Sequence, residues 1–174
     1  MAKKKKVNPR RIPLSKDAIN KDAILEEAVK DDLTHAWLLV AQPLLDAGYD
    51  LLPLSKTVYD YLKTERKKSN LEYNLKRVHT ILKFPFLSLD IRRIKSSVDL
   101  EAYKRRVAQV ALNNALCIVY LGLETVIPAD DLERIFFSAD LARAELEHGL
   151  TSYDELKKAL VEQEFTINEI ELPG

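Results

Sequence analysis

Apolar residues recur every three to four positions along most of this chain, which is the spacing of helices that bury one face. The first such stripe predicts a helix from about Asp17 to Asp46. Pro43 should kink this helix or begin its end, because proline lacks the N–H group of the helical hydrogen-bond ladder. Gly48 suits the left-handed position that commonly stops a helix.

Two shorter helices and one ambiguous stretch follow. A helix is expected over Ser55–Thr64, where Ser55 would be the N-cap, and another over 71–82, ended by Pro85. Residues 86–97 show no clear period and fit a short helix between loops.

The longest apolar pattern predicts a central helix over Asp99–Thr125. Its apolar positions lie on two sides, so we expect neighbouring helices all around it. The most apolar part, 107–127, contains polar side chains that would be costly in lipid, namely Gln109, Asn113, Asn114 and Glu124. We therefore interpret it as a buried helix of a soluble protein and expect no membrane partner.

The C-terminal third predicts two more helices. Pro128 suits the first position of a helix that Gly149 would stop. Ser152, followed three residues later by Glu155, forms a capping box for a last helix to about Gln163. The alternating tail that follows fits a short strand or an extended segment.

Together these patterns predict an all-α helical bundle of about six helices with a basic N-terminal arm. A shift of about 79 residues aligns apolar positions of the two halves, for example Leu33 with Leu112, Ala36 with Ala115, Val40 with Val119, Leu44 with Leu123 and Leu62 with Leu141. Two explanations stay open: two similar three-helix units produced by duplication, or chance alignment of amphipathic helices.

Charge is distributed unevenly along the chain. Residues 1–106 hold 23 Lys/Arg against 14 Asp/Glu, whereas 107–174 hold 4 against 13. We predict a basic flexible arm at 1–16, a basic helical half at 17–97 and an acidic helical half at 98–174, as two units or as one domain. Such a split points to charged partners rather than to chemistry on a substrate.

The basic part carries the nucleic-acid hypothesis, because lysine and arginine pair with phosphates and binding releases counterions. The candidate residues are Lys3, Lys4, Lys5, Lys6, Arg10, Arg11, Arg66, Lys67, Lys68, Lys76, Arg77, Arg92, Arg93 and Lys95, with Lys104–Arg106 as an extension. Three neighbouring tyrosines could stack on bases: Tyr59, Tyr61 and Tyr73. A solvated basic surface without a ligand is the structural alternative.

The acidic part carries a protein-interaction hypothesis. The candidate residues are Asp130, Asp131, Glu133, Asp140, Glu145 and Glu147. They could present a DNA-like negative surface to a basic host protein, or dock on the basic half of another copy to form a homo-oligomer. A solvated acidic surface is again the structural alternative.

Enzymatic chemistry finds little support in the sequence, and we expect no cofactor. Asp32 with His35 and Glu145 with His148 share the spacing of helical-bundle metal ligands, which makes a metal protein the third hypothesis. The single cysteine, Cys117, lies in an apolar run where a thiol behaves as a small hydrophobic side chain, and a lone reduced cysteine fits the cytoplasm.

Both ends of the chain carry a resemblance. The stretches are Arg10–Asp17, His35–Val40, Asp131–Ile135, Glu147–Lys157 and Glu164–Ile167. They resemble a group of small helical proteins encoded by phages and prophages of Gram-positive bacteria, and this chain is similar to a lengthened or doubled version. The resemblance implies a mobile element, the cytoplasm of a bacterial host cell and no mechanism.

The leading hypothesis is therefore a non-enzymatic binding protein of a phage or mobile element. It would act on nucleic acid or on a host nucleoprotein, such as a defence or transcription complex, through its basic arm and half. The alternative is a charge-driven interaction or assembly protein that masks a host protein or self-associates.

Overall fold

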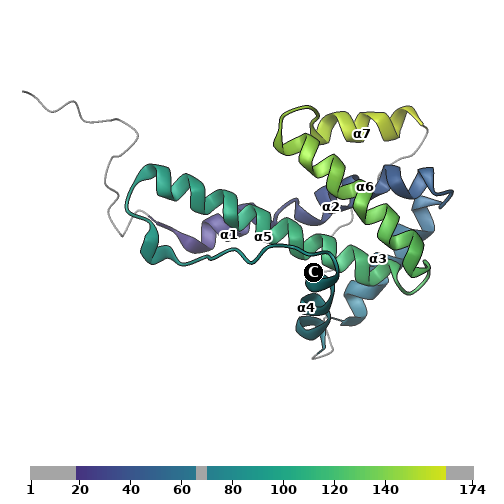
Figure 1. Ribbon diagram of the computed structural model, residues 1–174, viewed down its shortest axis with the longest axis horizontal. Helices are drawn as coiled ribbons and strands as arrows, with labels where there is room; N and C mark the ends of the chain where they lie inside the picture. Colours follow the sequence, from purple (N-terminus) through teal and green to yellow (C-terminus); the bar gives the residue numbers. More distant parts are fainter. Residues whose placement is uncertain (1–18, 66–69, 164–174) are drawn as a thin grey trace, which may run out of the picture. The chain divides into compact units, whose positions relative to one another are not determined.

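The computed structural model describes residues 19–65 and 70–163, and it confirms an all-α fold (Figure 1). In the described residues, the helical segments are α1 (Lys21–Val29), α2 (Asp32–Asp46), α3 (Leu51–Glu65), α4 (Leu71–Ile81), the short 3-10 helix η3 (Ile91–Arg93), α5 (Ser97–Leu123), α6 (Ala129–Glu147) and α7 (Tyr153–Glu162). The predicted basic arm and the alternating tail lie outside these residues.

Contacts divide the chain into two units. The smaller unit has residues 19–30 and 85–111 as its described part, and the larger unit has 31–65, 70–84 and 112–163. This division differs from the predicted halves, because each unit draws on two separated parts of the sequence. Helix α5 begins in the smaller unit and ends in the larger one.

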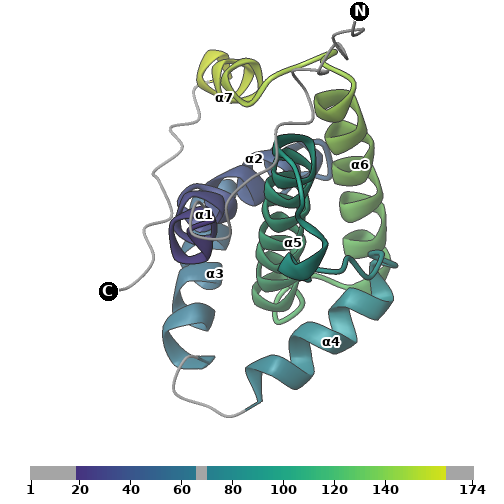
Figure 2. The ribbon, with the colours of Figure 1, turned by 90° about the vertical axis from the view of Figure 1, so that its left-hand side faces the viewer.

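Within the larger unit, α2 contacts α3, α6 and α7 (Figures 1 and 2). The reason lies in its composition, since α2 has buried side chains at most positions from Leu33 to Leu44. A helix that is apolar nearly all round requires neighbours on several sides. The sequence predicts a central position for the helix at 99–125, and the structure shows that α2 also has several helices around it.

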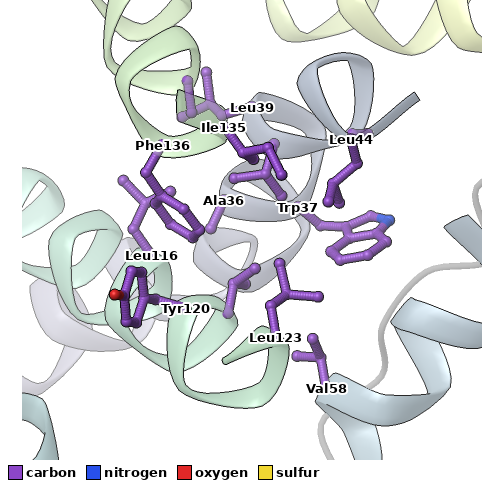
Figure 3. Packing of buried hydrophobic residues seen from close by; sticks show 14 of the residues in the cluster. Ala36, Trp37, Leu39, Leu44, Val58, Leu116, Tyr120, Leu123, Ile135 and Phe136 are labelled. Carbon is purple, nitrogen blue, oxygen red and sulfur yellow. The ribbon is translucent and has the colours of Figure 1, made fainter. Parts of the chain in front are cut away.

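The hydrophobic core belongs to the larger unit (Figure 3). Trp37 and Leu44 of α2 are 2% and 0% exposed, and they lie near Val58 of α3 and Leu123 of α5. Phe136 of α6 contributes a ring that packs edge-on against Tyr120, with 5.1 Å between the ring centroids. Aliphatic and aromatic side chains from α2 to α7 thus exclude water from one continuous cluster.

Three helices of the larger unit end in the same hydrogen-bonded motif. After α2, Gly48 adopts a φ of 86°, and the Tyr49 N–H donates to the Leu44 carbonyl at 3.0 Å. Gly149 does the same after α6 with a φ of 68°. The predicted glycine stops are therefore confirmed. After α4 the left-handed residue is Lys83, with a φ of 55°, so the helix has already ended before Pro85.

Of two predicted helix starts, the structure confirms one and contradicts the other. The capping box is confirmed: the Ser152 hydroxyl accepts from the Glu155 N–H at 3.2 Å, and the Glu155 carboxylate accepts from the Ser152 N–H at 2.9 Å. The Ser55 cap is wrong, because α3 already begins at Leu51. Asp50 accepts from the Leu52 N–H at 3.2 Å, and Ser55 donates to a carbonyl inside the helix.

The single helix predicted from Asp17 to Asp46 is also wrong, because the chain bends at Lys30 and Asp31. Helix α1 ends before the bend and α2 begins after it. The apolar stripe continued across the bend in the sequence, but Asp31 has a non-helical ψ of 9° with a φ of −120°. Consecutive aspartates favour helix starts over helix interiors, and a new first turn follows here.

At the shift that suggested an internal repeat, the two halves match in helix order but not in burial. Shifted by about 79 residues, α2, α3 and α4 coincide with the end of α5, with α6 and with α7. Positions in the first pair match, since Val40 and Val119 are both buried. In the second pair they do not, because Leu62 is 3% exposed and Leu141 is 54% exposed. Helices α3 and α6 therefore bury different faces at this shift.

Helix α5 is the one helix of the described residues that is long and apolar enough to cross a membrane. Its most apolar stretch is 61% buried within the protein, and core helices of soluble proteins meet the same criterion. This burial agrees with the core helix expected from the sequence. Even the polar residue Asn113 of this helix is only 1% exposed.

Candidate interaction surface

The outward side of α6 combines carboxylates with two large apolar side chains. We define the α6 outer face by its exposed residues Asp130, Glu133, Phe137, Asp140, Leu141 and Glu145. Spacings of three and four residues place them on one side of the helix. The opposite side is buried through Leu132, Ile135, Phe136 and Ala139. The face is therefore presented outward by a helix whose other side is anchored in the core.

The apolar part of this face is a ridge made by Phe137 and Leu141. Phe137 is 67% exposed and Leu141 is 54% exposed. Because they are four residues apart on one helix, their side chains are neighbours. A solvated helix surface has no need of an exposed phenylalanine beside leucine, whereas apolar side chains rimmed by charges are typical of interaction sites.

The charged part of the face is mostly uncompensated. In the described part of the chain, four of the six predicted acidic side chains take part in no ion pair, namely Asp130, Glu133, Asp140 and Glu145. The other two are engaged within the protein. Asp131 pairs with Arg134 at 2.5 Å, and Glu147 pairs with Arg143 at 3.3 Å. The structure thus divides the predicted set into four available carboxylates and two that serve the fold.

The start of α6 is tied to the end of α2. The Tyr49 hydroxyl, which follows the Gly48 turn, donates to the Asp131 carboxylate at 2.6 Å. This hydrogen bond, together with the Arg134 charge, holds the pKa of Asp131 below its ordinary value. The contact fixes the first turn of α6, so the residues of the outer face start from a defined position.

The end of α6 is held by a buried arginine that sequence reasoning missed. Arg143 is 7% exposed and donates to the Asn113 side-chain oxygen at 2.5 Å. Its guanidinium carbon lies 5.6 Å from the centre of the Phe84 ring, within cation–π range. Arg143 falls four residues after buried Ala139 on the apolar stripe of α6, and that spacing was the available indication of burial.

The histidine of the predicted metal pair has a packing role. The His35 ring stacks on Tyr153 with 3.7 Å between centroids and an interplanar angle of 5°. Burial lowers the pKa of His35 and raises that of Asp32 to about 6. In the described residues, His, Cys, Asp and Glu side chains form no group of three or more that could hold a metal ion.

The second predicted pair and the cysteine give no catalytic arrangement. Glu145 and His148 are exposed at the end of α6, where His148 is the C-cap. Cys117 is 0% exposed, and burial raises the pKa of its thiol to about 12. A thiol in that state is a poor nucleophile, which agrees with the structural role expected from the sequence.

The predicted nucleic-acid residues are distributed over both units and over segments outside the described residues. The arm residues and Arg66, Lys67 and Lys68 lie outside the described residues. Lys76 and Arg77 belong to the larger unit, where Lys76 pairs with Glu72 at 3.0 Å and Arg77 is hydrogen-bonded to both oxygens of Glu124. Arg77 is therefore a structural cation between α4 and the end of α5.

The remaining basic candidates lie in the smaller unit. Arg92 pairs with Asp90 at 3.0 Å, and this contact lowers the pKa of Asp90 to about 2. Arg93 and Lys95 are exposed, and in the described part of the chain their side chains form no ion pair. Among the predicted tyrosines, Tyr73 is 72% exposed, whereas Tyr61 packs against the core.

The comparisons with known proteins add no family. No family model matches the sequence, and no curated protein and no solved structure is significantly similar to the chain.

Proposed function

We propose that this chain is a non-enzymatic interaction protein that binds a basic segment of a protein partner on the α6 outer face. The observation that carries the proposal is the coexistence, on one helix face, of an exposed Phe137–Leu141 ridge and four carboxylates without an ion-pair partner in the described residues. Apolar contacts would supply most of the binding free energy, and the carboxylates would select a basic partner.

The anchoring of α6 supports this proposal. A binding face is more effective when it does not have to be ordered on binding, because ordering costs free energy. Asp131 is fixed by Tyr49 at one end of α6, and Arg143 by Asn113 near the other. Neither contact uses the six residues of the outer face, so the face is free to bind while the helix stays in place.

The test measures binding of a short fluorescent peptide of alternating lysine and leucine by anisotropy. We expect Phe137→Ala combined with Leu141→Ala to weaken binding about tenfold, as loss of an apolar hot spot does. The matched control is Val161→Ala combined with Leu150→Ala, which removes apolar side chains that are 55% and 76% exposed elsewhere. Equal binding by both double variants would show that only bulk charge attracts the peptide, and would reject the proposal.

Nucleic-acid binding is a second candidate function, favoured by the composition of the smaller unit. Residues 1–30 and 85–111 together hold 15 Lys/Arg against 7 Asp/Glu. Binding to duplex DNA, single-stranded DNA and RNA across a salt series tests it. Replacing Lys3, Lys4, Lys5 and Lys6 by Ala should flatten the salt dependence of binding. Fewer phosphate contacts would then form, and fewer counterions would be released on binding. No binding at low salt would remove this candidate.

A further inference from the structure

The smaller unit carries a surface that matches the α6 outer face in both charge and apolar character. Along residues 86–95 the exposed side chains are Phe86, Leu89, Arg92, Arg93 and Lys95, which we call the Phe86 segment. Phe86 is 94% exposed and Leu89 is 39% exposed. Two apolar side chains are thus followed by three basic ones, where the α6 outer face has two apolar side chains among acidic ones.

This segment is held in place by hydrogen bonds within the smaller unit. The Arg106 guanidinium donates to the Ser88 carbonyl at 3.2 Å. Asp90 accepts from the Arg92 N–H at 3.0 Å, and Asp99 accepts from the Lys95 N–H at 3.0 Å. None of these bonds covers Phe86. The fold therefore fixes the backbone of the segment and leaves its largest apolar side chain in water, which costs free energy unless a partner covers it.

We infer that the occupant of the α6 outer face is the Phe86 segment of a second copy of this chain, an inference that rests on the proposed function. Phe86 and Leu89 would cover the ridge of Phe137 and Leu141, while Arg93 and Lys95 would face the carboxylates. Both surfaces are uncovered in the single chain. They also lie in units of opposite sign, since the residues of the smaller unit sum to +8 and those of the larger to −8.

A contact between two different surfaces is heterologous, so it leaves one of each kind unused on the outer copies. Copies can then add head to tail until a ring closes or a filament grows. The assembly should weaken as salt screens the charges, because the charged groups of both surfaces are exposed.

The test is a charge exchange followed by sedimentation velocity of the full chain. One variant carries Glu133→Lys and Asp140→Lys, and the other carries Arg93→Glu and Lys95→Glu. We expect the unaltered chain to exceed its monomer mass of 19.9 kDa at low salt and to return to it at high salt. Each variant alone should stay at monomer mass, and an equimolar mixture of the two should associate again.

Two controls complete the design. Lys157→Glu with Lys158→Glu reverses two exposed charges on α7 and should leave association unchanged. Phe86→Ala should reduce association without lowering the melting temperature, since the side chain is exposed. A chain that stays monomeric at low salt, or a mixture that fails to associate, would overturn the inference. Peptide binding that still depends on Phe137 in such a monomer would leave the proposed function standing.

Discussion

The two units of this protein differ in how they use apolar residues. In the larger unit, the buried side chains of α2 and of its neighbours form one continuous cluster. In the smaller unit, α1 has no buried residue, and the buried hydrophobic side chains of its described part are Tyr103, Val107 and Ala111. These three do not belong to the cluster. Most of the apolar burial, and with it most of the hydrophobic stabilisation, therefore lies in the larger unit.

The difference continues within a single helix. The part of α5 in the smaller unit carries Lys104, Arg105 and Arg106, whereas the part in the larger unit buries Leu116, Leu121 and Leu123, among others. Helix α5 thus carries a cluster of charged residues near its start and contributes to the hydrophobic core at its end. Secondary structure alone does not decide whether a segment stabilises the fold or contacts a partner.

The sharpest way to test this comparison is the same substitution in both units. Leu44→Ala removes a side chain that is 0% exposed beside Trp37, and we expect a loss of about 2–5 kcal/mol in the free energy of unfolding. Leu25→Ala in α1 removes a side chain that is 53% exposed and should cost less than about 0.5 kcal/mol. Urea unfolding followed by far-UV circular dichroism, which reports the helices of both units, measures both. Similar losses would place part of the stability in the smaller unit.

A second test uses the close approach of α5 and α3 in the larger unit. A Cβ atom on Gly122 would lie 2.9 Å from the Val58 Cα atom, closer than such atoms pack. We expect Gly122→Ala to destabilise the protein by about 1–3 kcal/mol, although alanine is the better helix former. The same readout applies. Ala108→Gly, at an exposed α5 position of the smaller unit, should cost about 1 kcal/mol through helix propensity alone.

A stabilising result for Gly122→Ala would mean that α3 and α5 have room to separate. The core would then be less tightly packed at this point than the distance to Val58 indicates.

The smallest expected effect concerns the charge of Asp32, a half-buried residue near the start of the larger unit. Asp31 is exposed and the next residue, Asp32, is half-buried, with a pKa raised from 3.8 to about 6 by burial. Between these pH values the folded chain holds a proton that the unfolded chain has released, so the contribution of Asp32 to stability falls as pH rises through about 6. Asp32→Asn should therefore raise the free energy of unfolding at neutral pH.

Because Asp32 is partly in contact with solvent, we expect a gain below about 1 kcal/mol at pH 7, which disappears below about pH 4. Urea unfolding at both pH values measures it. Asp31→Asn removes a similar charge from an exposed side chain and serves as the matched control. A gain for Asp32→Asn that is the same at both pH values would show that the charge is not the cause.

Much of the fold followed from local rules. Helical periodicity predicted all-α structure and the extent of α5, and Gly48, Gly149 and the Ser152 capping box marked helix ends where the structure has them. These features depend on residues within one turn of each other, so the sequence contains all the information needed. Local rules failed where two choices were locally acceptable, as at Asp31 and at Ser55.

Only the charged part of the candidate site could be predicted from the sequence, because charge is visible in the residues themselves whereas exposure depends on packing. The six acidic residues of α6 were identified in the sequence, but the exposed ridge of Phe137 and Leu141 was not. Leu62 and Leu141, aligned by the apparent repeat, show the difficulty, since one is buried and the other exposed. Which of two amphipathic faces is covered depends on neighbours far away in the chain.

By itself, the sequence determined the class of fold, the helix ends and the uneven charge, because each depends on composition or on neighbouring residues. The tertiary structure alone decided that residues 31–65, 70–84 and 112–163 share a core, that Arg143 is buried on Asn113, and that Phe86 and Phe137 face water. Those outcomes depend on which helices pack together, and packing selects among faces that local patterns leave equivalent.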